Sequence, residues 1–378
     1  DSMRRDPYPT YARLRPQKVV HFAPADVWLV LDYAGVERAL TDHAHFSSNV
    51  SPSRNVRFEW LLFMDPPRHS RLRSLVAHAF TPRSIAALEP RIRTIARELL
   101  DAAGDAFDVV ADFAGRLPVR VIAELLGVAD AARFPAWSAA IVGLGDTIVG
   151  DAAAARAASD AFATADDEMG AFFTPLLATR RAHPADDLLA RLATAEVDGE
   201  RLDDDEILRF VQLLLAAGTE TTTDLVSNAL LSLDEHRNEW AKLRADLSLL
   251  PRAIEEVLRY RSPAQIVFRA TRADLELGGV RVPAGKMVLV VVGAANRDPA
   301  VFAAPDRFDI LREPNPHLAF GRGLHFCIGA PLSRLEGRVA LAELFVRARD
   351  FTLPSTQPWL PRPGFHVHGP RSLPIRLM

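Results

Sequence analysis

The chain has 378 residues, 49% of them hydrophobic, and its 45 basic and 48 acidic side chains leave a net charge of −3. This near-neutral balance gives no global basic field for nucleic acid, and the single cysteine, Cys327, excludes an internal disulfide. The longest apolar run, residues 287–295, is too short to span a membrane, and the N-terminus does not look like a signal peptide. We therefore expect a globular, cytoplasmic protein that binds neither nucleic acid nor membrane.

Helical patterns dominate the chain, with strand-like pieces near residues 27–31 and 280–292. No change in composition marks a linker, so we expect one domain over residues 1–378. The Ala-rich stretch 151–171 keeps regular apolar positions, which favours a helix over disorder. Asp198-Gly199 predicts a turn.

The most informative predicted helix covers about residues 203–233. Asp203 and Glu206 have the spacing of a capping box at its start. At about 1.5 Å per residue, the whole predicted helix is about 45 Å long. Its apolar stretch up to Gly218 indicates that it is buried. The next five residues, 219–223, are Thr-Glu-Thr-Thr-Thr, which are poor choices for a buried helix. Broken local rules of this kind cluster at functional sites.

Cys327 lies in the glycine-rich run 320–329, ahead of an amphipathic helix predicted over residues 332–347 with Pro331 in its first turn. A helix N-terminus stabilises a thiolate, and a thiolate is one of the few protein ligands of haem iron. A lone cysteine is more commonly a small buried hydrophobe. The surrounding glycines favour the metal ligand here, because they let the backbone turn tightly and approach a flat ring.

Taken together, four segments resemble motifs of the cytochrome P450 family, and the chain looks like its soluble bacterial type. The matching segments are the heme-propionate segment 65–73, the oxygen-activation motif 217–221, the E-x-x-R element 256–259 and the cysteine-ligand loop 320–329. The resemblance implies a mainly α fold with small β-sheets, a single-domain cytochrome P450 fold. It also implies heme b (iron protoporphyrin IX) between the long central helix and the C-terminal cysteine-ligand helix.

By this resemblance, Cys327 binds the iron, and further residues contact the haem. These are Phe320, Gly321 and Gly329 in the loop, and His69, Arg73, Arg269 and His325 at the propionates. Arginine suits a bidentate carboxylate contact. Taken alone, His69 is a surface histidine and Arg269 a charge at a strand edge.

Glu256 and Arg259 are three residues apart on a predicted helix and can pair. In the family they form a buried network with an arginine before the cysteine loop, and Arg312 occupies that place. An isolated E-x-x-R pair is more often a solvated surface pair.

The implied activity is hydroxylation or epoxidation with O2 as co-substrate. Thr221 and Glu220 are expected to deliver protons, and Gly218, next to Ala217, to let the helix open locally. Alternatively, residues 219–223 bond back to carbonyls one turn earlier.

The expected substrate wall is apolar, which favours a hydrophobic organic small molecule. Its members are Phe63, Leu214, Ala264, Ile266, Val267 and Phe365. Each of them could equally be ordinary core.

The chain has no extra length for a flavin or iron–sulfur domain, so the resemblance implies electrons from a ferredoxin and an NAD(P)H-dependent ferredoxin reductase. Arg68, Arg71 and Arg322 could form a docking patch for an acidic partner, although charge runs are more often solvated faces.

A dinucleotide site is disfavoured because Gly321-Arg-Gly323 lacks the third glycine of its motif, and no zinc motif is present. A non-catalytic haem sensor or recruitment module, or a peroxide-driven enzyme, would share the fold. Neither would need the pair Glu220 and Thr221.

Overall fold

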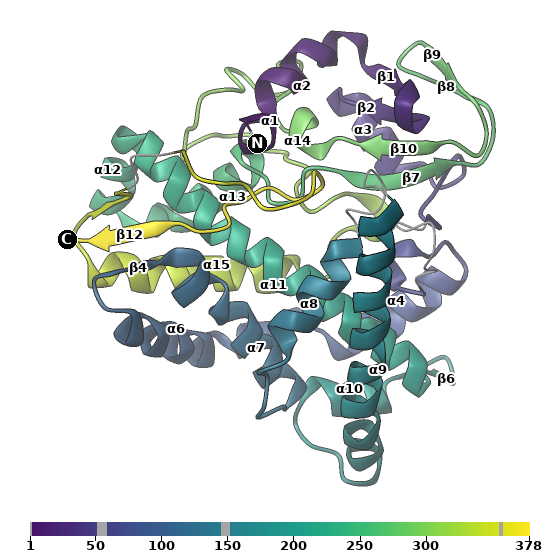
Figure 1. Cartoon of the computed structure of the whole chain (residues 1–378), viewed down its shortest axis with the longest axis vertical. Helices are drawn as coiled ribbons and strands as arrows, with labels where there is room; N and C mark the ends of the chain where they lie inside the picture. The colour runs from purple at the N-terminus through teal and green to yellow at the C-terminus, as the bar shows by residue number, and fades with distance from the viewer. Residues whose placement is uncertain (1, 51–58, 145–151, 355–357) are drawn as a thin grey trace. The chain divides into compact units, whose positions relative to one another are not determined.

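The computed structural model describes residues 2–50, 59–144, 152–354 and 358–378 (Figure 1). The chain divides into two compact units. Unit 1 comprises residues 1–47, 89–117 and 221–378, and unit 2 comprises residues 48–88 and 118–220. The described chain is mainly helical with small sheets, which confirms the predicted fold class.

The largest sheet of unit 1 has the strand order β1-β2-β10-β7-β3. Its strands are β1 (Val19–Phe22), β2 (Val27–Val30), β3 (Phe46–Ser47), β7 (Val267–Thr271) and β10 (Met287–Val290). β10 runs parallel to β2 and antiparallel to β7. The strand predicted near residues 27–31 is confirmed. The piece predicted near 280–292 is two strands, β9 (Val280–Val282) and β10, because Gly285 turns the chain between them with φ at 73°.

The other strands of the described chain form three smaller sheets. In unit 1, β11 (Phe351–Thr352), β12 (Pro374–Leu377) and β4 (Ala106–Asp108) form one sheet, and β8 (Leu275–Leu277) pairs with β9. In unit 2, β5 (Glu196–Val197) pairs with β6 (Glu200–Arg201). The predicted turn between them is confirmed, since Asp198 and Gly199 have φ of 53° and 79°.

The rest of unit 1 is mostly helical. Its helices include α1 (Ser2–Arg5), α2 (Tyr8–Leu14), α3 (Tyr33–Thr41), α6 (Glu89–Ala103), α12 (Arg237–Ala245), α13 (Leu250–Tyr260), α14 (Val292–Ala295) and α15 (Ala330–Arg347). Along β10 the side chains alternate between two apolar clusters, because successive residues of a strand point to opposite faces. Val288 and Val290 pack with Val36 and Phe302, and Leu289 packs with Leu31.

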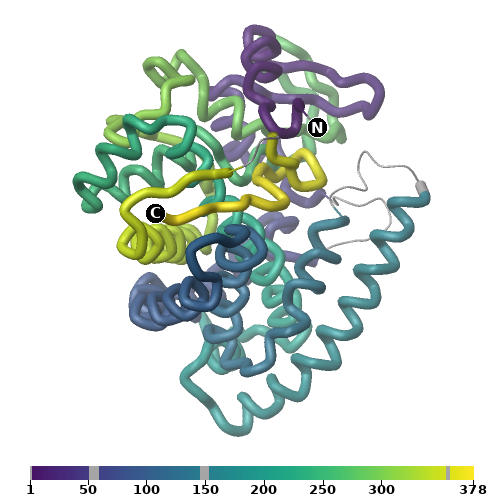
Figure 2. Tube along the Cα trace, turned by 60° about the vertical axis from the view of Figure 1, so that its left-hand side comes forward, coloured from purple at the N-terminus to yellow at the C-terminus, as the bar shows by residue number. Residues whose placement is uncertain are grey.

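Unit 2 is built mostly from helices. They are α4 (Arg68–Ala79), α5 (Pro82–Ala86), α8 (Phe134–Gly143), α9 (Ala152–Ala182) and α10 (Leu188–Thr194), with α7 (Arg116–Leu126) entering from unit 1. α8 lies along α9, and Figure 2 shows these two teal helices side by side. The rings of Phe134, Trp137, Phe172 and Phe173 interlock between them. The predicted Ala-rich helix is therefore present, although Asp151 lies outside the described residues.

The long central helix is α11 (Asp204–Glu235), and it continues from unit 2 into unit 1 without a break. Both bonds of the predicted capping box are present. The Glu206 N–H donates to Asp203 Oδ1 at 2.7 Å, and the Asp203 N–H donates to Glu206 Oε2 at 3.2 Å. Among the residues that the structure describes, none of the helices combines the length and apolar character needed to cross a bilayer.

Candidate functional site

The loop that carries Cys327 folds back on itself in unit 1 just before α15. The Cys327 N–H donates to the Phe320 carbonyl at 2.9 Å, and the Phe326 N–H donates to the Gly323 carbonyl at 3.1 Å. Gly321 and Gly323 make this turn with φ of 71° and 73°, a region that other residues rarely occupy. The half-buried Cys327 thus lies three residues before α15, which has Pro331 in its first turn as predicted.

The geometry of this loop fits a haem. A thiolate can bind haem iron, and the loop presents one thiol close to a helix N-terminus, where backbone N–H groups favour negative charge. An added Cβ at Gly329 would lie 3.8 Å from the Cys327 sulfur, an ordinary contact distance, so Gly329 lies directly beside the sulfur. The expected roles of Cys327 and Gly329 as haem contacts are therefore compatible with the local structure.

A charged cluster holds the start of the loop against α15. The guanidinium of Arg334 lies over the Phe320 ring at 4.5 Å and donates to both oxygens of Glu255 at 2.7 and 2.8 Å. His317 Nε2 lies 3.0 Å from the same carboxylate. Burial alone would raise the pKa of Glu255, but the hydrogen bonds from Arg334 and His317 outweigh it and lower the pKa to about 2. Sequence reasoning missed Glu255 and His317, since neither belongs to a motif.

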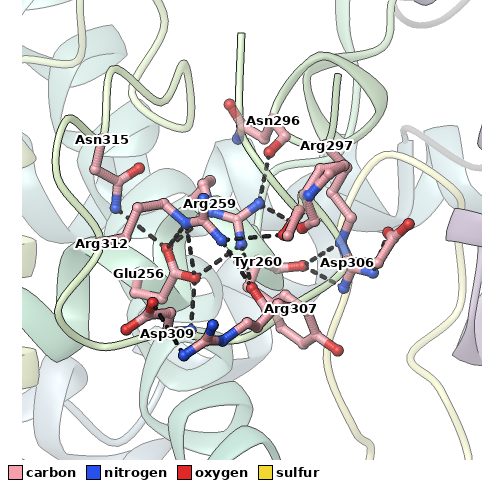
Figure 3. A network of polar contacts seen from close by, with 12 residues as sticks. Glu256, Arg259, Tyr260, Asn296, Arg297, Asp306, Arg307, Asp309, Arg312 and Asn315 are labelled. Atoms are coloured by element: carbon pink, nitrogen blue, oxygen red, sulfur yellow. Dashed lines mark hydrogen bonds and ion pairs between the residues drawn. The ribbon is translucent and has the colours of Figure 1, made fainter. Parts of the chain in front are cut away.

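The structure brings Glu256, Arg259 and Arg312 together (Figure 3). Arg259 donates from Nε and from a terminal nitrogen to the two oxygens of Glu256, each at 2.8 Å, and both side chains are 0% exposed. Arg312 Nε lies 3.2 Å from both oxygens of the same carboxylate. The E-x-x-R pair is thus a buried network and not a solvated surface pair.

Backbone groups extend this network toward the cysteine loop. Arg259 donates to the carbonyls of Asn296 at 3.0 Å and Pro305 at 2.8 Å, while the Asp309 N–H donates to Glu256 at 2.9 Å. Asn296 Oδ1 accepts from the Leu318 N–H at 2.7 Å, two residues before Phe320. Figure 3 shows how these groups converge on α13. The network therefore fixes the chain that leads into the loop.

The middle of α11 changes from buried to accessible and back within a few residues. Leu214 is buried, Ala217 is exposed, and Gly218, Glu220 and Thr221 are half-buried. The side chains of the next two threonines, Thr222 and Thr223, point into the core. Each of them makes a hydrogen bond to another element, and neither of these bonds goes to a carbonyl one turn earlier in α11. Thr222 hydrogen-bonds Glu336 of α15, and Thr223 donates to the Ala114 carbonyl at 3.1 Å.

Gly218 has a packing role that sequence reasoning did not foresee. α11 stays helical at this residue, although we expected the glycine to let it open. A Cβ added here would lie 3.0 Å from Ile122 Cδ1 of α7, closer than ordinary packing allows. The glycine thus permits close approach of α7 in this structure.

Four residues predicted at the propionates lie on three elements. His69 and Arg73 are four residues apart on α4 in unit 2, and His69 is buried. Arg269 is buried on β7 of unit 1, with β10 on one side and β3 on the other, so it is not at a strand edge. His325 lies in the short turn η7 (Gly323–His325) beside Cys327. Both His69 and Arg269 are buried, so neither is the surface group that its residue type alone would suggest.

The residues expected at the substrate wall fall into two groups. In unit 1, the segment around Ala264 and Ile266 pairs with the chain beside Phe365, since the Gln265 N–H donates to the His366 carbonyl at 2.8 Å. Val267 follows at the start of β7. In unit 2, Phe63 stacks on Trp60 at 6.1 Å, and Leu214 lies on α11.

The three arginines considered for partner docking all form ion pairs. Arg68 pairs with Glu59 at 2.7 Å, Arg71 with Glu200 and Glu206, and Arg322 with Glu37. Each positive charge is therefore partly neutralised by a carboxylate of its own unit.

A family model described as Cytochrome P450 matches residues 154–372. The chain is also similar to the cytochrome P450 monooxygenase PikC of Streptomyces venezuelae, with 41% identity over 98% of this chain and 91% of that protein. With the erythromycin C-12 hydroxylase of Saccharopolyspora erythraea it shares 42% identity over 92% of this chain and 89% of that protein.

Among solved structures, the chain resembles CYP109E1 from Bacillus megaterium in complex with corticosterone. The TM-score is 0.90 with 37% identity, and the match covers 100% of each chain.

Proposed function

We propose that this chain, which belongs to the cytochrome P450 family, inserts one oxygen atom from O2 into a hydrophobic organic substrate by hydroxylation or epoxidation. Membership makes it a haem-dependent monooxygenase. The observation that carries the proposal is the half-buried Cys327 thiol just before the N-terminus of α15, held in a loop that Gly321 and Gly323 turn back on itself. The proposed haem domain spans residues 1–378.

The cofactor in this proposal is haem b, with Cys327 as its protein ligand, and when bound it supplies the iron that activates O2. Phe320, Gly321 and Gly329 would contact it from the loop. The cations for its propionates are His69 and Arg73 on α4, Arg269 on β7, and His325 in η7. The burial of Arg269 supports this role, because a buried guanidinium is stable beside an anion.

Thr221 and Glu220 are the proposed groups for proton delivery. Both are half-buried on α11, between the exposed Ala217 and the buried Thr222. A hydroxyl can donate a hydrogen bond to reacting oxygen, and a carboxylate can pass protons from water. The turning of Thr222 and Thr223 into the core supports a separate role for Thr221.

The proposed substrate is large and mostly apolar, and secondary metabolism is its proposed context. Apolar residues dominate the expected wall in both units. The names of two similar proteins, an erythromycin C-12 hydroxylase and CYP109E1 in complex with corticosterone, support a molecule of that size.

Electrons are proposed to come from a ferredoxin and an NAD(P)H-dependent ferredoxin reductase. The exposed pairs of Arg68 and Arg322 with glutamates support at most a weak, salt-sensitive docking contact.

The test begins with the purified, haem-loaded protein reduced by dithionite and exposed to carbon monoxide. We expect a red-shifted Soret band that Cys327→Ser abolishes and that the control Ser333→Ala, one turn into α15, leaves intact. Absence of the band in the unmodified protein, or its survival in Cys327→Ser, would overturn the proposal.

Turnover then separates the related functions. With ferredoxin, reductase and NAD(P)H, we expect isotopically labelled O2 to leave one labelled oxygen atom in the product. Product formed only with added peroxide would indicate a peroxide-driven enzyme. A normal Soret band without turnover of any compound that shifts the spin state would indicate a haem sensor or recruitment module.

A further inference from the structure

The C-terminal hairpin, residues 361–370, is built onto the segment that contains Ala264. Its two arms meet where the Arg362 N–H donates to the Gly369 carbonyl at 2.9 Å. The far arm then pairs with residues 263–266, since the His368 N–H donates to the Pro263 carbonyl at 2.8 Å. Figure 2 shows this part of the yellow C-terminal segment as a compact loop. The hairpin and residues 263–266 thus form one layer.

The tip of the hairpin carries Phe365. Gly364 turns the chain there with φ at 90°, and the Phe365 ring meets the Phe268 ring of β7 edge-on at 6.4 Å. Phe365 also packs against the apolar cluster that includes Ile266. The position of the tip therefore depends on where the base of the hairpin is held.

α11 holds that base through two polar side chains one turn apart. Arg362 Nε donates to Asp224 Oδ1 at 2.7 Å, and Asn228 Nδ2 donates to the His368 carbonyl at 2.9 Å. The bond to Arg362 holds the first arm of the hairpin, and the bond to His368 holds the second arm. A Cβ added at Gly369 would lie 2.2 Å from Asp224 Oδ1, so the backbone of the far arm packs directly on the carboxylate.

Stability alone does not explain this pair. Asp224 is 0% exposed and Arg362 18% exposed, so both charges lose most of their hydration. Burial raises the pKa of Asp224 to about 6 even though Arg362 opposes the shift. Because apolar residues of the same size often stabilise a buried site better than an ion pair, the gain from such a pair lies in fixing one geometry.

We propose that Asp224 and Arg362 form a positioning pair that fixes the C-terminal hairpin on α11 and so sets where Phe365 stands in the substrate wall. Asp224 follows Thr221 by three residues on α11, so the wall is tied to the helix about one turn from the proposed proton donor. This inference rests on the proposed function. It makes the pair a determinant of how bulky substrates bind, without contact to the reacting atoms.

Two haem-iron ligands of different size provide the test. Imidazole is small and reports the iron site, whereas 4-phenylimidazole carries an extra ring that, under this proposal, reaches the wall. In Asp224→Asn and in Arg362→Met we expect the 4-phenylimidazole dissociation constant, read from the Soret shift, to rise about tenfold. The imidazole constant should stay within about twofold. The control Arg371→Met removes an exposed arginine at the base of the same hairpin and should change neither constant.

A double-mutant cycle separates positioning from general damage. In the Phe365→Ala background, Arg362→Met should have no further effect on 4-phenylimidazole affinity, because the wall residue it positions is gone. The inference would be overturned if the variants lost the same affinity for both ligands, or if they kept wild-type affinity for both. It would also be overturned if the effects of Arg362→Met and Phe365→Ala on 4-phenylimidazole affinity were fully additive.

The double variant Asp224→Asn with Arg362→Gln removes both buried charges together. We expect it to bind haem and to show the same selective loss of 4-phenylimidazole affinity. If it fails to bind haem, the pair is structural and the inference is wrong. The proposed function fails separately, through absence of the red-shifted Soret band in the unmodified protein.

Discussion

Unit 1 buries two glutamates in opposite ways. Glu256 of α13 is 0% exposed and accepts hydrogen bonds from Arg259, Arg312 and the Asp309 N–H. Glu336 of α15 is 1% exposed and hydrogen-bonds Thr222, while its Oε1 has no hydrogen-bond partner among the described residues. Burial raises the pKa of Glu336 to about 8, against the effect of the Thr222 hydroxyl.

The difference assigns different physical tasks to the two regions. Around Glu256, paired charges and backbone groups lock the chain that leads to the Cys327 loop, so this region is rigid and sensitive to loss of any partner. Around Glu336, a sparsely bonded acid lies against the helix that carries Thr221, and its raised pKa keeps it protonated in the folded state until the pH approaches about 8. Four variants, or pairs of variants, test this contrast.

The largest expected effect follows from breaking the Glu256 network. Arg259→Met leaves a buried carboxylate with fewer partners, which should cost about 3–5 kcal/mol of the free energy of unfolding and most of the bound haem. Urea unfolding and the Soret absorbance per mole of protein measure both losses. The control Arg252→Gln on the same helix removes an exposed pair with Glu313 and should cost under about 1 kcal/mol. Similar losses in both variants would contradict the contrast.

Glu336→Gln should act in the opposite direction, and its effect depends on pH. The folded state holds the Glu336 proton up to a pKa of about 8, whereas the unfolded state releases it near the model value of 4.5. The wild-type protein therefore loses stability as pH rises between these values, by about 1.4 kcal/mol per pH unit. Glutamine cannot ionise, so the variant should gain stability over the wild type from pH 5 to pH 9.

Glu343, seven residues or about two turns further along α15, is the matched control for this measurement. Burial would raise its pKa, but hydrogen bonds from Arg97 and Arg93 lower it instead. Glu343→Gln should therefore destabilise the protein at neutral pH, with no gain as pH rises. Urea unfolding at pH 5, 7 and 9 compares the two variants, and the same sign in both would refute the assignment.

Local patterns in the sequence predicted many of the elements that hold the site. The capping box at Asp203, the helix after Cys327 and the turn at Asp198 each depend on neighbours within a few residues, and each is present. These signals are local because caps, turns and apolar periodicity are set by adjacent backbone groups.

The partners that stabilise the site could not be predicted in this way. Arg362 and Asp224 are 138 residues apart, and Arg334 of α15 bonds Glu255 79 residues away. No periodicity links such distant positions, and both acids look like ordinary surface residues in the sequence. The packing of Gly218 on Ile122 is hidden for the same reason, because it depends on how α7 meets α11.

The sparsely bonded region also carries Thr221, the proposed proton donor, which Thr221→Ala examines. Removal of the hydroxyl should uncouple the reaction, and the product formed per NAD(P)H consumed should fall about tenfold if the missing hydrogen bond is worth about 1.4 kcal/mol in the rate. Any compound that shifts the spin state serves as the trial substrate. Thr223→Ala is the control, since that hydroxyl donates to the Ala114 carbonyl, and its coupling should stay unchanged. Wild-type coupling in Thr221→Ala would remove Thr221 from the mechanism.

The smallest effect is expected at the surface of the tightly bonded region, where Arg322 pairs with Glu37 beside the cysteine loop. If this arginine helps to dock an acidic ferredoxin, Arg322→Gln should slow reduction a few-fold at low salt and make the rate less salt-dependent, because exposed charges act mainly through steering. Arg281→Gln removes a more exposed, carboxylate-paired arginine on β9 and should leave the rate unchanged. Stopped-flow reduction at rising ionic strength measures all three proteins. If Arg322→Gln is reduced at the wild-type rate at every salt concentration, the surface around Arg322 does not steer the donor. The region around the loop then serves only to hold the loop in place.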